Sequence, residues 1–199
     1  FGKHTGGLSV KIKTDVNCRK LAHFALFSIS SVPVIFYILV AIQRLLFPFD
    51  IDWSEGAGLL QVMHILSGKS LYQAPSLNFT PLIYTPLYYY LAAGFTLIFG
   101  NGLLPLRLLS FLFSLATFGL IIYIVYRETR NALAAWISGA LYIGCFALSD
   151  GFYDLARPDS FFVFILLLTF VMFLADRRPL TLVISGLMIS VVFFTKQSG

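Results

Sequence analysis

The sequence predicts an all-α polytopic membrane protein, with about five transmembrane helices and further helices at the outer membrane surface. Hydrophobic residues make up 58% of its 199 residues. Charged residues make up only 12%, about half the share of a soluble domain. Uncharged runs near the roughly 20 residues needed to cross a bilayer recur along the chain. The Lys and Arg residues are scattered between these runs, so the net charge of +5 does not indicate a nucleic-acid-binding protein.

Residues 1–20 form a basic N-terminus, which we expect on the cytoplasmic side because short cytoplasmic segments are rich in Lys and Arg. The first uncharged run, Phe24 to Ile42, is long enough to span, and its Pro33 is tolerated in a membrane helix. The run is too long for a signal peptide and lacks a cleavage site. We expect residues 21–199 to be the N-terminal part of a longer transmembrane domain.

The segment from about 47 to 105 is predicted to be the first extracytoplasmic loop. It starts with the acidic stretch FPFDIDWSEG, continues as an amphipathic helix over 58–68, and then becomes rich in Tyr and Pro. Tyrosines such as Tyr84 suit the membrane interface. The remaining uncharged runs are 82–99, 108–126, 132–149, 160–175 and 180–195.

The run 82–99 decides between five and six crossings. If it crosses, Arg127, Arg130, Arg177 and Arg178 lie outside. If it lies at the outer surface instead, these arginines join the basic N-terminus inside, and the carboxylates of the two acidic loops share the outer side. Because short cytoplasmic loops are enriched in Lys and Arg, we prefer five crossings, with six as the alternative.

Under this topology, carboxylates and bases from separate segments meet at one membrane surface. They are Asp52 and Glu55 in the first loop, Arg107 before the second span, Arg157 and Asp159 before the fourth, and Lys196 after the fifth. A carboxylate can act as a general base, which is worth about 10²–10⁴-fold in rate. Lys and Arg bind phosphate through charge-assisted hydrogen bonds. The pattern therefore indicates group transfer from a lipid-linked phosphate donor.

The order of the motifs resembles the N-terminal half of GT-C glycosyltransferases, of the protein mannosyltransferase and lipid A aminoarabinose transferase type. The motifs are WSEGAGLLQVMHILSG, TPLYYYL, LPLRLLSFL, FYDLARPDS and FFTKQSG, and the resemblance covers about residues 35–199. The usual Asp before the Glu of this family is Ser54 here, so Asp50 or Asp52 would have to supply the missing carboxylate.

The resemblance implies a multi-pass enzyme of a bacterial-type plasma membrane, with an extracytoplasmic active site. Its donor would be a hexose or pentose on a polyprenyl-phosphate carrier, and its acceptor a lipid, glycan or protein. Besides these and the membrane lipids, no nucleic acid is expected as a partner. No cofactor is required by the pattern. A divalent metal remains an open alternative, although no residues have metal-ligand spacing.

The resemblance also gives each candidate residue a role. Glu55, with Asp52, would deprotonate the acceptor. Arg107, Arg157 and Lys196 would hold the donor phosphate. Asp159 would orient one of these cations, and Tyr84 would contact substrate. Structural roles compete with these: the arginines could anchor the chain at the interface, Lys196 could be an end-of-helix cation, and Asp159 could stabilise a helix N-terminus.

As a fragment of a larger enzyme, the chain alone is expected to be inactive, and two other functions stay open. A non-catalytic membrane subunit is favoured by Ser54 in place of the usual Asp. A transporter of a lipid-linked substrate is disfavoured, because transporters usually carry ionisable residues near the middle of the membrane. The predicted spans here are nearly free of charge, with Arg44 near the outer end of the first span as the nearest exception.

Overall fold

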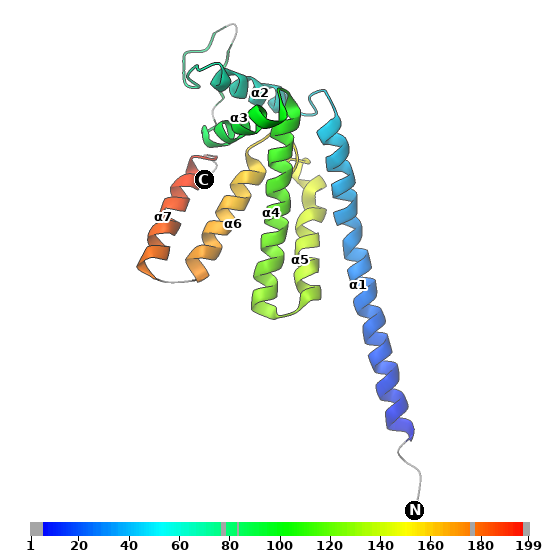
Figure 1. The fold of residues 1–199 in the computed structure, drawn as a ribbon. Helices are drawn as coiled ribbons and strands as arrows, with labels where there is room; N and C mark the ends of the chain where they lie inside the picture. Colours follow the sequence, from blue (N-terminus) through cyan, green and yellow to red (C-terminus); the bar gives the residue numbers. More distant parts are fainter. Residues whose placement is uncertain (1–5, 77–78, 83, 176–177, 197–199) are drawn as a thin grey trace, which may run out of the picture.

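A computed structural model describes residues 6–76, 79–82, 84–175 and 178–196, and it confirms the predicted all-α fold class (Figure 1). Residues 1–5 of the predicted basic N-terminus and Arg177 lie outside the described residues. The helices are α1 (Gly6–Leu46), α2 (Trp53–Leu66), α3 (Leu87–Phe99), α4 (Leu103–Thr129), α5 (Ala132–Gly144) with the 3-10 helix η1 (Cys145–Ser149), α6 (Asp159–Ala175) and α7 (Pro179–Phe193).

Five helices form a bundle and two lie across one of its ends. Figure 1 shows α1, the α4–α5 hairpin and the α6–α7 hairpin side by side, with α2 and α3 above them. We call this end the α2 end. The ends of α4 and α6 and the starts of α5 and α7 lie at the opposite end, as does the start of α1. The fold therefore places the basic turns at one end and the acidic loops at the other, as the charge pattern predicts.

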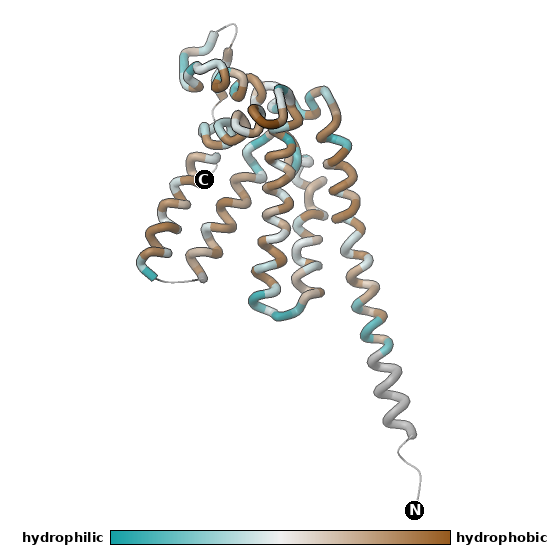
Figure 2. The backbone as a smooth tube through the Cα atoms, in the orientation of Figure 1, coloured by the Kyte–Doolittle hydropathy of each residue, from teal (hydrophilic) through white to brown (hydrophobic). Residues whose placement is uncertain are grey.

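Three helices are long and apolar enough to cross a membrane by length and composition, over Asn17–Leu46, Leu103–Thr129 and Ala132–Ser149. The apolar helices α6 and α7 are shorter, but they stand beside these spans (Figure 1). Large apolar side chains on α7 face outwards, including Leu180 and Leu187 (70% and 63% exposed). Hydrophobic residues run along all five bundle helices in Figure 2. Such surfaces suit lipid, which solvates apolar side chains and leaves backbone groups to bond within helices.

Helix α3 is the apolar run whose crossing was in question. It has 13 residues, close to the 15 of α7, so its position and not its length sets it apart from the bundle helices. It lies beside α2 at the end of the bundle and not among the spans (Figure 1). The arrangement therefore favours five crossings over six.

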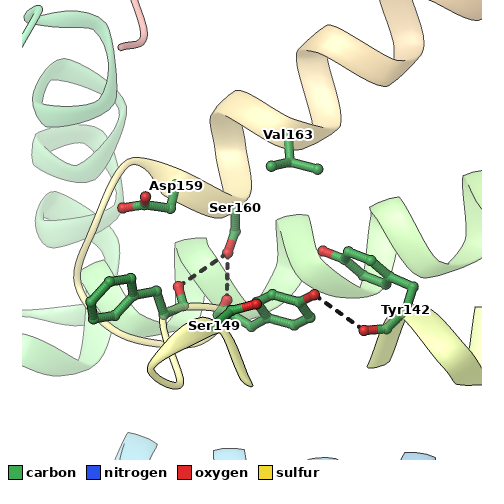
Figure 3. A pocket seen from close by; sticks show the side chains of 7 residues that line it. Tyr142, Ser149, Asp159, Ser160 and Val163 are labelled. Atoms are coloured by element: carbon green, nitrogen blue, oxygen red, sulfur yellow. Dashed lines mark hydrogen bonds between the residues drawn. The ribbon is translucent and has the colours of Figure 1, made fainter. Parts of the chain in front are cut away.

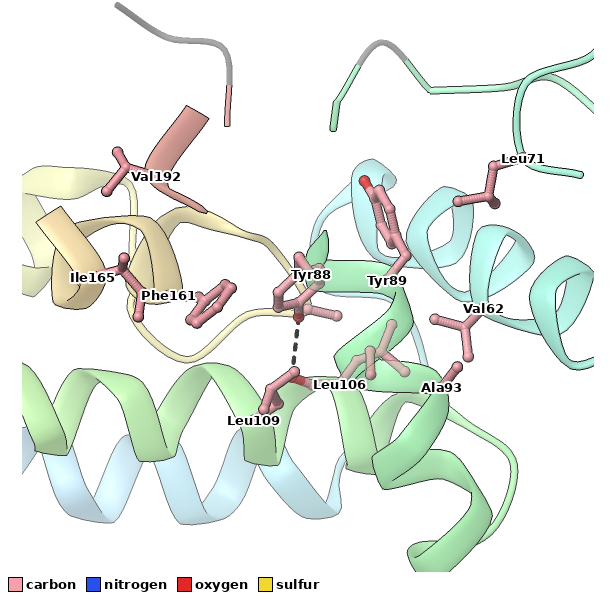
Figure 4. Packing of buried hydrophobic residues seen from close by; sticks show 12 residues of the cluster. Val62, Leu71, Tyr88, Tyr89, Ala93, Leu106, Leu109, Phe161, Ile165 and Val192 are labelled. Carbon is pink, nitrogen blue, oxygen red and sulfur yellow. Dashed lines mark hydrogen bonds between the residues drawn. The ribbon is translucent and has the colours of Figure 1, made fainter. Parts of the chain in front are cut away.

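Two apolar clusters hold the fold together. One joins α1 to α5 and η1 around the buried Tyr37 and Ile143. The other joins the α2 end to the bundle, and Figure 4 shows Tyr88 and Tyr89 of α3 between the apolar side chains of α2, α4 and α6. The Tyr88 hydroxyl donates to the Leu106 carbonyl oxygen (3.2 Å), which fixes α3 against α4. Helices α2 and α3 are thus part of the packed structure.

Close approach of α4 and α5 depends on Gly139. A Cβ at this position would lie 2.8 Å from Phe118 and Ile122 side-chain atoms. Asn131 caps the start of α5, where its side chain accepts from the backbone N–H groups of Leu133 (3.0 Å) and Ala134 (3.2 Å). The Asn131 cap therefore fixes where α5 begins, and Gly139 lets α5 pack closely against α4.

Candidate active site

The predicted site residues come together at the α2 end. Three segments meet there: the connection from α1 to α2, the 150–158 loop between η1 and α6, and the end of α7 (Figure 1). Asp52 is the N-cap of α2, and its side chain accepts from the Ser54 backbone N–H (2.9 Å). An Asp at this position satisfies a helix N–H that has no partner within the helix. The cap fixes where α2 begins and hence where Glu55 lies.

Glu55 and Arg107 form a fully buried ion pair. Arg107 donates from Nε to Glu55 Oε1 (2.8 Å) and from Nη2 to Glu55 Oε2 (2.6 Å), and both side chains are 0% exposed. The remaining donors of Arg107 also point into protein. They reach the carbonyl oxygens of Arg44 (2.7 Å), Phe47 (2.6 Å) and Phe49 (2.8 Å). Arg107 lies in the second turn of α4 and is not at the surface as an interface anchor would be.

The Glu55 carboxylate also receives two backbone N–H groups. Oε2 accepts from Ile51 (2.8 Å), one residue before Asp52, and Oε1 accepts from Ala156 (2.9 Å), one residue before Arg157. Burial raises the pKa of Glu55, but these hydrogen bonds and Arg107 more than reverse the rise, so the net pKa is lowered. Glu55 is thus a saturated carboxylate that sets the distance between the segments carrying Asp52 and Arg157.

A second set of charges lies nearer the surface. Arg157 donates from Nη1 to Asp52 Oδ1 (3.2 Å) and to the Ser54 hydroxyl (3.1 Å), and from Nε to Asp159 Oδ2 (3.2 Å). The Ser54 hydroxyl itself donates to Asp52 Oδ1. Lys196 Nζ donates to Asp159 Oδ1 (2.6 Å). We call Asp52, Arg157, Asp159 and Lys196 the charged row, because opposite charges alternate along it.

The charged row keeps unused donors. Its side chains are between 12% and 23% exposed. Among the described residues, Arg157 Nη2 donates no hydrogen bond and Lys196 donates only the one to Asp159. Aromatic rings flank both cations: the Phe152 ring centroid is 3.9 Å from the Arg157 guanidinium carbon, and that of Tyr84 is 6.0 Å from Lys196 Nζ.

The surroundings of Asp52 keep its carboxyl group ionised. Burial raises the pKa of Asp52, while hydrogen bonds from Ser54 and the charge of Arg157 lower it, and the net result is a lowered pKa. Ser54 therefore links Asp52 to Arg157 at the position where the GT-C pattern usually has an Asp. Asp52 supplies a carboxylate near that position, two residues upstream.

A cavity of about 230 Å³ adjoins Asp159 (Figure 3). Phe152 and Tyr153 line it from the 150–158 loop, and Tyr142 and Val163 from α5 and α6. The cavity gives room beside the charged row for part of a substrate. Among the residues that the structure describes, no three His, Cys, Asp or Glu side chains are grouped so as to hold a metal ion.

All seven predicted site residues therefore lie at the α2 end, but in different environments. Glu55 and Arg107 are buried and fully paired, whereas Asp52, Arg157, Asp159, Lys196 and Tyr84 line the accessible side. Sequence reasoning missed Ser54 as a ligand of Arg157, and it missed the Phe152 ring. The Glu55–Gly56 motif contains one structural signal: a Cβ at Gly56 would meet the Asp50 carboxylate, so that side chain would have to move if Gly56 were replaced.

A family model described as dolichyl-phosphate-mannose-protein mannosyltransferase matches residues 81–199, which is more than half of the chain. The matched region contains Arg107, Arg157, Asp159 and Lys196, and it starts after Asp52 and Glu55. No curated protein and no solved structure matches the chain. The resemblance drawn from the motifs is thus confirmed at the level of the family. On the strength of this match, the chain belongs to the dolichyl-phosphate-mannose-protein mannosyltransferase family, which is of the GT-C type.

Proposed function

We propose that this chain is part of a glycosyltransferase that moves a sugar from a polyprenyl-phosphate carrier to an acceptor hydroxyl or amine on the extracytoplasmic side of a membrane. The charged row is the observation that supports this proposal. It combines a partly exposed carboxylate with two cations whose remaining N–H donors have no partner among the described residues, at the α2 end of an apolar bundle. A lipid phosphate at headgroup depth could reach these donors while its tail stays in the bilayer.

In this proposal Asp52 is the general base. It takes the proton of the acceptor as the acceptor atom attacks the anomeric carbon of the donor. The bond from that carbon to the phosphate oxygen breaks with inversion, and polyprenyl phosphate leaves with the electron pair. Arg157 Nη2 and the free N–H groups of Lys196 stabilise the negative charge that develops on the phosphate. Asp159 holds both cations in place through one carboxylate oxygen each.

Glu55 and Arg107 take a positioning role. The sequence favoured Glu55 as the base and Arg107 as a phosphate ligand, but both are buried and their hydrogen-bonding capacity is used within the protein. A base must come within hydrogen-bond distance of the proton that it removes. Asp52 meets that condition better because 20% of its side chain is exposed.

Asp52→Asn in the full-length protein tests this assignment. Asn has nearly the same shape and still accepts a hydrogen bond, but it cannot act as a base. We expect transfer to fall by about 10²–10⁴-fold while the affinity for a polyprenyl-phosphate sugar changes little. Asp50→Asn is the matched control. Wild-type-like transfer by the Asp52 variant would remove Asp52 as the base, and donor binding by a wild type that transfers no sugar would favour a non-catalytic subunit.

The sidedness of the α2 end needs a separate test. Cys18 and Cys145 are free and exposed, so both are first replaced by alanine. In that background, Asn101→Cys should react with a membrane-impermeant maleimide added from outside, and Glu128→Cys should react only after the cells are opened. The reverse labelling pattern would place the charged row on the cytoplasmic side and contradict the proposal.

A further inference from the structure

A second ion pair, between the partly exposed Arg44 and the buried Asp154, lies beside the charged row, and the proposed reaction does not use it. Arg44, at the end of α1, donates from Nη1 to Asp154 Oδ1 (3.1 Å) and to the Gly151 carbonyl oxygen (3.0 Å). The Asp154 side chain is 0% exposed and that of Arg44 is 25% exposed. Arg44 is the ionisable residue that the sequence placed near the outer end of the first span, and these contacts account for it.

The 150–158 loop lies directly on the Arg44 guanidinium group. Gly151 has a φ of +70°, which favours glycine. A Cβ at this position would lie 2.9 Å from Arg44 Nη1 and 3.0 Å from Nη2. The backbone conformation therefore favours glycine at 151, and a larger residue there would push the Arg44 guanidinium group away from the loop. The contact is a specific fit between α1 and the loop.

The pair is poorly suited to stabilising the fold for its own sake. Asp154 Oδ2 is buried and has no hydrogen-bond partner among the described residues, and the same holds for the buried hydroxyl of Tyr37. Burial raises the pKa of Asp154, and Arg44 reverses only part of the rise. Buried ion pairs often contribute little net stability, and their best-supported use is to select one arrangement of the chain.

The arrangement selected here includes two members of the charged row. The 150–158 loop consists of turns and bends between η1 and α6, and Arg157 and Asp159 follow Asp154 by three and five residues. Hydroxyl groups of α4 support the loop from the other side, since Ser110 donates to the Arg157 carbonyl oxygen (3.0 Å). Without the hydrogen bonds from Arg44 of α1, only contacts with the other helices would hold the loop next to Arg157.

We propose that Arg44 and Asp154 are positioning residues, which hold the 150–158 loop against α1 so that Arg157 and Asp159 face the donor. The pair is also linked to the buried Glu55–Arg107 pair by a hydrogen bond, in which Arg107 Nη1 donates to the Arg44 carbonyl oxygen (2.7 Å). The role in donor binding depends on the proposed function, whereas the role in holding the loop does not.

Arg44→Gln and Asp154→Asn in the full-length protein test this proposal with two measurements. The first is hydrogen–deuterium exchange, in which peptides covering 150–158 should exchange at least about 10-fold faster than in the wild type, since a lost contact worth about 1.4 kcal/mol has that effect on an opening equilibrium. Peptides from α2 should be unchanged. The double variant should resemble either single variant, because the two residues act as one pair. Arg127→Gln, which removes an exposed ion pair with Glu128, is the control.

The second measurement is the donor KM as a function of pH. Asp154 is faced by Arg44 and Tyr37 from α1 and interacts electrostatically with Glu55 from α2. As the pH falls, Asp154 takes up a proton at a higher pH than an ordinary Asp, and the neutral side chain releases Arg44. The wild-type donor KM should therefore rise on acidification, whereas Asp154→Asn should have a raised donor KM that lacks this dependence. Wild-type protection of the loop in both variants would overturn the proposal; a loosened loop in a protein that binds no polyprenyl phosphate would overturn only the proposed function.

Discussion

Two sets of ion pairs lie within a few residues of each other at the α2 end, and they differ in one respect that decides their roles. The Glu55–Arg107 pair is 0% exposed and every donor group of the guanidinium reaches a protein oxygen. The charged row is partly exposed, and its two cations keep N–H groups without a partner among the described residues. Residue type and spacing alone do not separate these sets.

The difference teaches how a site on irregular loops can be kept in shape. Loops bear most of the functional groups, yet a group must be held to within a fraction of an ångström to act. Here the buried carboxylate of Glu55 holds the backbone next to Asp52 on one side and next to Arg157 on the other. In the function proposed here, the buried pair supplies the rigidity and the charged row supplies the reacting and phosphate-binding groups.

The largest effect is expected from Arg107→Met, which breaks the buried pair on one side. It leaves the Glu55 carboxylate buried without its cation, and it removes donors from the Arg44, Phe47 and Phe49 carbonyl oxygens. Losing one partner of a buried pair typically costs about 3–5 kcal/mol. We expect loss of the folded protein, measured as the monodisperse fraction after detergent extraction. Arg127→Met, at an exposed pair, should extract like the wild type, and an equal yield for both variants would remove the distinction between the two sets.

Glu55→Gln should have an intermediate effect, and it sharpens the comparison with Asp52→Asn. The variant keeps the shape of Glu55 but loses its charge and turns an amide NH2 group towards N–H donors, which should lower stability by about 3 kcal/mol, the lower end of the cost of removing one partner of a buried pair. The fold lowers the pKa of Glu55, so its charge stabilises the folded protein at every pH above the pKa of an ordinary Glu. This contribution is lost as the pH falls through the lowered pKa of Glu55.

The thermal midpoint of the wild type should therefore fall as the medium is acidified below an ordinary Glu pKa of 4.5, and that of Glu55→Gln should fall less. Asp52→Asn should change transfer far more than stability. If Glu55→Gln instead abolishes transfer with an unchanged thermal midpoint, Glu55 is the base, and the roles of the two carboxylates are reversed.

The smallest effect is expected from Lys196→Met, which removes one cation from the accessible row. Asp159 keeps Arg157 as a partner and is 23% exposed, so loss of the Lys196 ammonium group should change stability little. We expect the donor KM to rise about 10-fold, the equivalent of about 1.4 kcal/mol, with kcat less affected. Lys69→Met, in the exposed turn after α2, is the control. A wild-type donor KM in the Lys196 variant would exclude Lys196 as a phosphate ligand.

Much of this molecule could be predicted from the sequence because membrane burial leaves a strong mark on composition. Uncharged runs marked the helices that form the bundle, and the distribution of arginines indicated that 82–99 does not cross. The order of short motifs indicated the family that the match to 81–199 confirms. Each of these signals depends on local composition or on motif order, so it can be read without knowing which residues touch in the folded protein.

The division of labour within the site was decided only by tertiary structure. In sequence, Glu55 and Asp52 are both acidic residues of one loop, and Arg107 and Arg157 are both arginines near helix starts. Whether a charge is saturated depends on partners 52 residues away for Glu55 and Arg107, and 105 residues away for Asp52 and Arg157. Burial and unused hydrogen-bonding capacity are properties of the folded chain, and they separate the residues that hold the site from those that can act on a substrate.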